Sequence, residues 1–198
     1  MPAYTLAPTD TVIAPDGTIL YRIQYADGTR GGYLQSTANL DPTSDAQVLG
    51  DAQVSGNAWV SGNARVSGDA RVSGNAQVSG NAWVSGNARV SGNAWVFGNA
   101  RVSGNAWVSG NARVFGNAQV SGNARVSGDA DYICIGPIGS RNACVTWTRS
   151  DDCIVTGCFC GTVGEFRAAV IATHGDNHHA RAYLAMLDFI AIVREGGK

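Results

Sequence analysis

Apolar and polar positions repeat with a period of six along the middle of this chain. From Ala46 to Val126, fourteen units follow one another without an insertion, and each reads Ala-x-Val followed by a short, mostly Ser-Gly-Asn stretch. Ala and Val are two positions apart, so on an extended strand they point to one face and the residue between them to the other. Such a strict short repeat predicts a β-solenoid with a thin core of Ala and Val.

The remaining positions of each unit predict its corners. Gly followed by Asn or Asp supplies a bend, because both residue types tolerate left-handed backbone dihedrals. Only a small and a medium-sized side chain face inward, which suits a narrow triangular tube with three units, or eighteen residues, in each turn. Fourteen units divided by three then form about 4.7 turns.

The repeat and the residues before it resemble a known group of proteins. The unit Ala64-Arg65-Val66-Ser67-Gly68-Asp69 resembles the hexapeptide repeat of left-handed β-helix proteins. Gly31-Gly32-Tyr33-Leu34 and Asn39-Leu40 resemble the leader of YdcK-like hexapeptide proteins of bacteria and phages, from which Tyr33, Leu34 and Asp41 depart. The resemblance implies a left-handed parallel β-helix, and the handedness comes from the resemblance alone.

Three segments are expected, in a fold that is mainly β. Residues 1–45 form a β-meander that caps the first turn, with strands at 11–14 and 18–24 around a Pro-Asp-Gly turn. Residues 46–130 form the solenoid. Residues 131–198 form an α+β module of three strands and two helices, in which the sequences GPIGSRN and THGDNHHA resemble a small C-terminal domain of phage-type repeat proteins.

Hydrophobicity and capping signals place the elements of this C-terminal module. Strands are predicted at 132–135, 143–148 and 153–160. Thr162 and Glu165 form a capping box for a helix at 166–173, which Gly175 ends. Asp176 or Asn177 begins a second helix that extends from about residue 178 to 194.

Large aromatic residues interrupt the otherwise small and polar outer positions of the solenoid. Columns of eighteen residues place Trp83 between Arg65 and Arg101, Trp107 between Arg89 and Arg125, and Phe97 beside Phe115. So many exposed aromatics predict that at least one face is an interface between copies of the chain. The predicted interface residues are Trp59, Trp83, Trp95, Phe97, Trp107 and Phe115.

Composition narrows the class of protein. Charged residues make up 15% of the 198 residues and the formal net charge is −1, which argues against a nucleic-acid-binding face despite the Arg and Trp columns. No apolar run is long enough to span a membrane and no secretion signal is visible, so a cytoplasmic location is expected. The five cysteines all follow the repeat, and we expect reduced thiols in preference to a disulfide.

The C-terminal module carries the candidate binding residues. A tight loop at Ser140, Arg141 and Asn142 offers a hydroxyl, a guanidinium and backbone amides to an anion such as phosphate. His174, Asp176 and Asn177 lie at the junction of the two helices, where backbone amides are free. The alternative interpretation is purely structural: a hairpin loop and a helix stop followed by a cap.

Two other chemistries receive weaker support from the sequence. Cys158, Cys160, His174 and His178 could supply zinc ligands, but a Cys-x-Cys strand lacks the usual knuckle spacing, and no metal or cofactor is predicted. Acyl transfer, the common activity of left-handed β-helix enzymes, needs a general base. The three histidines of the chain all follow residue 173, outside the repeat.

These observations favour a cytoplasmic, non-enzymatic homo-oligomer, most simply a trimer, with the solenoid as its spine. The C-terminal module would bind a phosphate-bearing ligand, one version being a phage protein that sequesters a host nucleotide signal. The two alternatives are a structural or assembly protein without a ligand, and an acyltransferase of the hexapeptide-repeat class.

Overall fold

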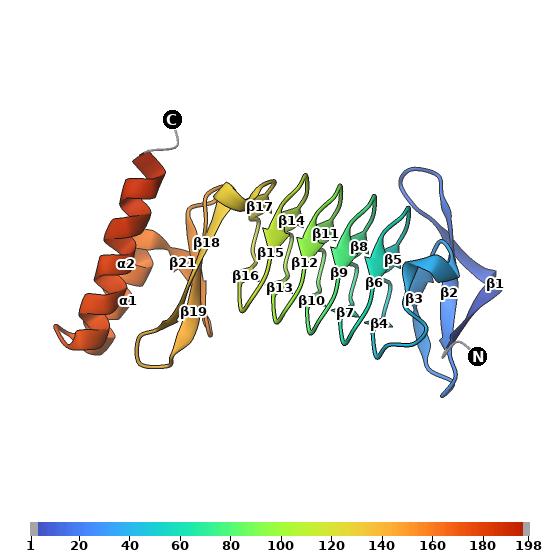
Figure 1. Cartoon of the computed structure of the whole chain (residues 1–198), viewed down its shortest axis with the longest axis horizontal. Helices are drawn as coiled ribbons and strands as arrows, with labels where there is room; N and C mark the ends of the chain where they lie inside the picture. The colour runs from blue at the N-terminus through green and yellow to red at the C-terminus, as the bar shows by residue number, and fades with distance from the viewer. Residues whose placement is uncertain (1–3, 196–198) are drawn as a thin grey trace.

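The computed structural model describes residues 4–195 as a parallel β-solenoid of about five turns between two terminal segments (Figure 1). Each of the fourteen sequence units forms one two-residue strand, and strands eighteen residues apart pair in parallel. The predicted β-helix with a C-terminal sheet and two helices is therefore confirmed.

The strands stack into three sheets, which we name faces A, B and C. Val84, for example, pairs with Val66 and Val102, so one column holds the same position of successive turns. Face A contains β5 (Gln53–Val54), β8 (Arg71–Val72), β11 (Arg89–Val90), β14 (Trp107–Val108) and β17 (Arg125–Val126). Face B contains β6 (Trp59–Val60), β9 (Gln77–Val78), β12 (Trp95–Val96) and β15 (Arg113–Val114). Face C contains β4 (Gln47–Val48), β7 (Arg65–Val66), β10 (Trp83–Val84), β13 (Arg101–Val102) and β16 (Gln119–Val120).

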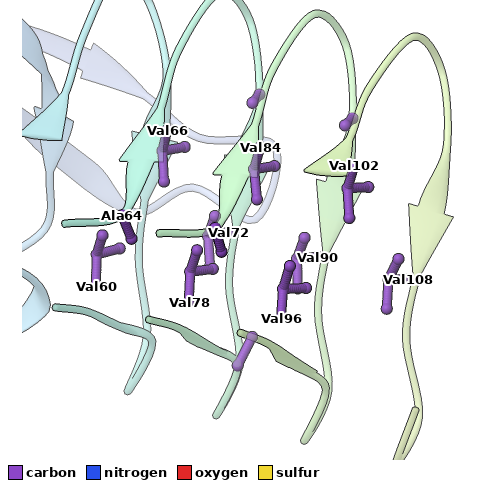
Figure 2. Packing of buried hydrophobic residues seen from close by; sticks show 14 of the residues in the cluster. Val60, Ala64, Val66, Val72, Val78, Val84, Val90, Val96, Val102 and Val108 are labelled. Carbon is purple, nitrogen blue, oxygen red and sulfur yellow. The ribbon is translucent and has the colours of Figure 1, made fainter. Parts of the chain in front are cut away.

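The solenoid core consists of the Ala and Val side chains of the repeat. All fourteen valines, from Val48 to Val126, have no exposed surface. Figure 2 shows valines of the middle turns, among them Val66, Val84 and Val102, in columns along the tube. Burial of a valine contributes about 1.5–3 kcal/mol. The inside and outside positions are thus distributed as the period of six predicts.

Glycine and asparagine have different roles at the corners. Gly74 has a φ of 69°, and a Cβ placed on it would lie 3.0 Å from the backbone nitrogen of Gly92 in the next turn. Within the repeat, only glycines adopt such a positive φ among the described residues. The asparagines instead form amide ladders, in which Asn75 Nδ2 donates to Asn93 Oδ1 at 2.9 Å and Asn93 Nδ2 donates to Asn111 Oδ1 at 3.1 Å.

The N-terminal segment continues face A and closes the first turn. It contains β1 (Tyr4–Ile13), β2 (Ile19–Tyr25), β3 (Arg30–Leu34) and the short 3-10 helix η1 (Thr37–Asn39). The first strand starts earlier than predicted, and β3 pairs in parallel with β5, placing Leu34 beside Val54. Buried Asn39 donates through Nδ2 to the carbonyl oxygens of Gly56 and Ala58, both at 2.9 Å.

The C-terminal module is a four-stranded antiparallel sheet covered on one side by two helices (Figure 1). After η2 (Asp129–Asp131) it contains β18 (Tyr132–Ile138), β19 (Ala143–Thr148), β20 (Cys153–Thr156), β21 (Phe159–Thr162), α1 (Val163–His174) and α2 (His178–Glu195). The single strand predicted at 153–160 is wrong: Gly157 adopts a φ of 56° and turns the chain into a hairpin. Neither helix is long and apolar enough to cross a membrane.

The cysteine prediction is also wrong for one pair. Cys134 on β18 and Cys144 on β19 form a disulfide, with their Cα atoms 6.2 Å apart. The two residues lie on neighbouring antiparallel strands, where Cys134 pairs with Thr146, so the sheet itself brings the sulfurs together. Cys153, Cys158 and Cys160 are free thiols.

Candidate functional site

A cavity of about 250 Å3 lies in the C-terminal module, between the sheet and the two helices. The β18–β19 loop contributes Ser140 and Arg141, and the end of α1 contributes His174. The structure therefore brings three of the predicted ligand residues to one cavity. The other lining residues are Thr156, Cys158, Phe159, Phe166, Ala169, Val170, Thr173 and Tyr183.

Close packing fixes the position of the β18–β19 loop. Gly139 has a φ of 69°, and a Cβ placed on it would lie 2.0 Å from the hydroxyl oxygen of Tyr183. Only glycine therefore allows the loop to approach α2 this closely. On the other side, Arg141 Nη1 lies 3.7 Å from Cys158 Sγ in the β20–β21 turn.

The charge of the cavity lining is positive. Within residues 4–195, its charged or titratable lining includes Arg141 and His174 but no carboxylate. Arg141 has no ion-pair partner among the described residues, which is also true of Arg149 and Arg181 in the module. An unpaired guanidinium can hold two oxygens of an anion at once.

Part of the cavity wall is aromatic. Phe159 and Phe166 have ring centroids 5.1 Å apart, and Phe166 meets Tyr183 edge-on at 5.4 Å. These residues were not among the sequence-predicted site residues. Phe166 and Tyr183 belong to apolar helix faces, which signal packing, and Phe159 reaches the cavity because of the unpredicted hairpin.

The remaining predicted ligand residues do not line the cavity. Asn142 lies in the β18–β19 turn with a φ of 47°. Asn177 Oδ1 accepts from the backbone nitrogens of His179 at 2.9 Å and Ala180 at 3.1 Å, so its side chain caps α2. Asp176 lies in the same junction between the two helices. The purely structural interpretation, in which one helix stops and a cap residue begins the next, describes this junction.

The alternative zinc ligands are not assembled. In the described part of the chain, no group of three or more His, Cys, Asp or Glu side chains could hold a metal ion. Cys160 Sγ lies 3.8 Å from Cys153 Sγ, Cys158 lies beside Arg141, and His178 packs against His179 with ring centroids 3.7 Å apart. Burial, followed by the Cys160 thiol, raises the pKa of Cys153 to about 12, so this thiol is protonated at neutral pH.

A wider depression of about 860 Å3 lies near the start of the solenoid, beside Tyr4 and Tyr25. Asp27 and Asp41 belong to its lining, but each carboxylate accepts a hydrogen bond from its own turn. These backbone bonds lower the pKa of both groups. Turn formation therefore accounts for the positions of both carboxylates and for their lowered pKa.

The outer aromatics of the solenoid are distributed over all three faces. The register confirms Trp83 between Arg65 and Arg101, and Trp107 between Arg89 and Arg125. Trp83 lies on face C and Trp107 on face A, whereas Trp59 and Trp95 lie on face B.

Face B carries the densest aromatic group. Phe97 and Phe115 follow β12 and β15 and stack with ring centroids 5.5 Å apart, as their spacing predicts. Trp95 meets Phe97 edge-on at 6.3 Å, and Arg113 lies over Trp95 at 5.9 Å. We call Trp95, Phe97 and Phe115 the face B cluster. Trp95 is 44% exposed and Phe115 is 50% exposed, so the cluster offers apolar surface to a partner.

Comparison with known proteins identifies one similar family. Residues 45–135 match the bactofilins, a family described as polymer-forming and cytoskeletal. The match covers the solenoid and the face B cluster, and it supports a β-helix fold. The matched residues leave out most of the N-terminal segment and most of the C-terminal module. The YdcK-like resemblance depends on these two parts of the chain. A comparison with curated proteins found no match.

Proposed function

We propose that this protein has a structural role and associates with copies of itself through the sides of its solenoid. The observation that carries this proposal is the exposed face B cluster, inside the segment that matches the polymer-forming bactofilins. Covering apolar surface stabilises an interface by about 25 cal/mol per Å2 before the costs of association.

The two ends of the solenoid favour contacts through its sides. At the N-terminal end, β3 pairs with β5 and the β1–β2 hairpin extends the same sheet. At the C-terminal end, side chains of η2 and of the module accept hydrogen bonds from the last turn. Because the chain covers both ends of the tube, the face B cluster is the more accessible contact surface.

A closed trimer, the assembly expected from the sequence, would require contact between two different faces of neighbouring copies with a rotation that closes the ring. Contact between face B of one copy and face B of another would instead give a closed pair, while contact between different faces can continue into an open polymer. Trp83 and Trp107, exposed on faces C and A, would support such an open arrangement.

The repeat supplies its own replacements for a test. Ser occupies the position of Phe97 and Phe115 in most other units, and Arg occupies the position of Trp107 in several. We expect Phe97→Ser combined with Phe115→Ser to reduce the mass measured by light scattering, without lowering the melting temperature. Trp107→Arg tests in the same way whether the exposed aromatic of face A contributes to the contact.

The result can contradict the proposal in two ways. If the parent protein scatters as one chain of 20.5 kDa at micromolar concentration, self-association is wrong. If the Phe97 and Phe115 variant keeps the parent mass while Trp107→Arg dissociates, face A is the interface and face B is not.

Binding of a small anionic ligand by the C-terminal module is a second candidate function. The shared cavity of Ser140, Arg141 and His174 favours it. Sequestration of a host nucleotide signal by a phage protein is a narrower version, which would require the cavity to accept a nucleotide.

A further inference from the structure

We propose that the cavity of the C-terminal module binds a phosphate monoester with a compact body. This inference rests on the second candidate function and is independent of self-association. The phosphate would lie at Arg141 and Ser140, and the body would lie against the aromatic wall of Phe159 and Phe166.

The cavity lining itself indicates an anion. Arg141, Arg149 and Arg181 of the module have no carboxylate partner among residues 4–195, and of these three only Arg141 lines the cavity. The same lining contains the hydroxyl of Ser140 and the imidazole of His174, which can donate to phosphate oxygens. Since no carboxylate lines the cavity in the described residues, nothing there opposes a negative ligand.

The loop that carries Ser140 and Arg141 is held in place before any ligand arrives. Gly139 packs directly on Tyr183, which fixes the loop that carries Ser140 and Arg141. Gly157 lies so close to Arg141 that a Cβ there would be 3.2 Å from Nη1. Preorganised donors bind an anion more tightly because less side-chain freedom is lost.

Volume and wall chemistry define the rest of the ligand. Pockets for drug-sized ligands are roughly 300–1,000 Å3, and this cavity of about 250 Å3 is smaller. The tilted rings of Phe159 and Phe166 suit a single ring or a short apolar body. The class is therefore a small monoester such as an aryl phosphate, and a dinucleotide is too large to be enclosed.

The test is calorimetry on the full chain with phenyl phosphate, inorganic phosphate, phenol and adenosine monophosphate. We expect saturable binding of phenyl phosphate, weaker binding of inorganic phosphate and none of phenol. Arg141→Gln should weaken phenyl phosphate binding ten- to hundredfold, the effect expected for loss of a charged hydrogen bond. Arg181→Gln, an exposed change on α2 outside the cavity lining, should bind as the parent does.

A second measurement does not depend on any variant. Cys158 is exposed and lines the cavity, so phenyl phosphate should slow its alkylation and leave the alkylation of Cys160 unchanged, as measured by peptide mass spectrometry.

Absence of saturable binding, or equal affinity of Arg141→Gln and parent, would overturn the site. Equal slowing by phenol would show an apolar pocket without anion selectivity and would also overturn it. Tight adenosine monophosphate binding with weak phenyl phosphate binding would mean that the ligand carries a nucleoside, and the proposed compact body would then be wrong. Light scattering on the same samples separates these outcomes from failure of self-association.

Discussion

The side-chain hydroxyl of Thr146 accepts a hydrogen bond from the backbone nitrogen of Gln119 at 2.8 Å, across the boundary between module and solenoid. Asp129 Oδ1 accepts in the same way from the Arg113 nitrogen at 2.8 Å, and Ser150 Oγ from the Arg125 nitrogen at 2.7 Å. Gln119, Arg113 and Arg125 begin the last strands of faces C, B and A. Each of the three sheets thus has an open backbone N–H of its last strand satisfied by a different side chain.

Removal of one of these acceptors should weaken the C-terminal end of the tube. Thr146 is fully buried, so Thr146→Val leaves the Gln119 amide without a partner and should cost about 1–3 kcal/mol in the free energy of unfolding. Thr146→Ser keeps the hydroxyl and is the control. Urea unfolding measures both, and equal midpoints for Val and Ser would mean that the hydroxyl does not cap face C.

The solenoid core should not tolerate charge. Val84→Asp places a carboxylate among buried valines without a partner and should cost at least about 3 kcal/mol, whereas Arg89→Ala on the outside should cost less than about 1 kcal/mol. Thermal unfolding compares the two variants. Similar melting temperatures would contradict the inside and outside assignment.

The solenoid could be predicted from the sequence because every unit carries the same local information. A fixed spacing of Ala, Val and Gly determines strand, face and corner together, and no distant residue is needed. The stacking of Phe97 on Phe115 follows from the same arithmetic. The asparagine ladders are less obvious, since their hydrogen bonds depend on the side-chain conformations of successive turns.

The C-terminal module depends on contacts that have no period. The β20–β21 turn was not predicted because Gly157 is flanked by residues with strand propensity, and the disulfide was not predicted because Cys134 and Cys144 pair only once β18 and β19 align. Ser140, Arg141 and His174 could be selected by their chemistry. Their aromatic wall could not, since Phe166 and Tyr183 also satisfy the pattern of a helix core.

The disulfide should stabilise the module measurably. Cys134 and Cys144 are separated by 10 residues, and closing a loop of that size contributes about 2–3 kcal/mol in the chain-entropy account. Reductant should therefore lower the unfolding midpoint of the parent, while Cys134→Ser combined with Cys144→Ser should start lower and not respond to reductant. Cys158→Ser, which removes an exposed free thiol, should respond as the parent does. A parent midpoint that reductant leaves unchanged would contradict the prediction.

The N-terminal cap should be sensitive to alkaline pH through Tyr4. Its hydroxyl donates to the carbonyl oxygens of Leu40 at 2.7 Å and Thr37 at 3.0 Å, which holds the first turn against β1. Burial, with smaller contributions from Tyr25 and Asp41, raises the pKa of Tyr4 from 10.0 to about 12. A folded pKa above the unfolded value means that the unfolded state loses its proton first. The stability due to Tyr4 is therefore complete below pH 10 and is lost as pH rises toward 12.

Tyr4→Phe should be less stable at neutral pH and should lose less stability over this alkaline interval. Urea unfolding, together with tyrosinate absorbance, measures both effects. Parallel losses in parent and Tyr4→Phe would assign the alkaline transition to other groups, of which Tyr25 and Tyr132 also have a pKa raised by burial.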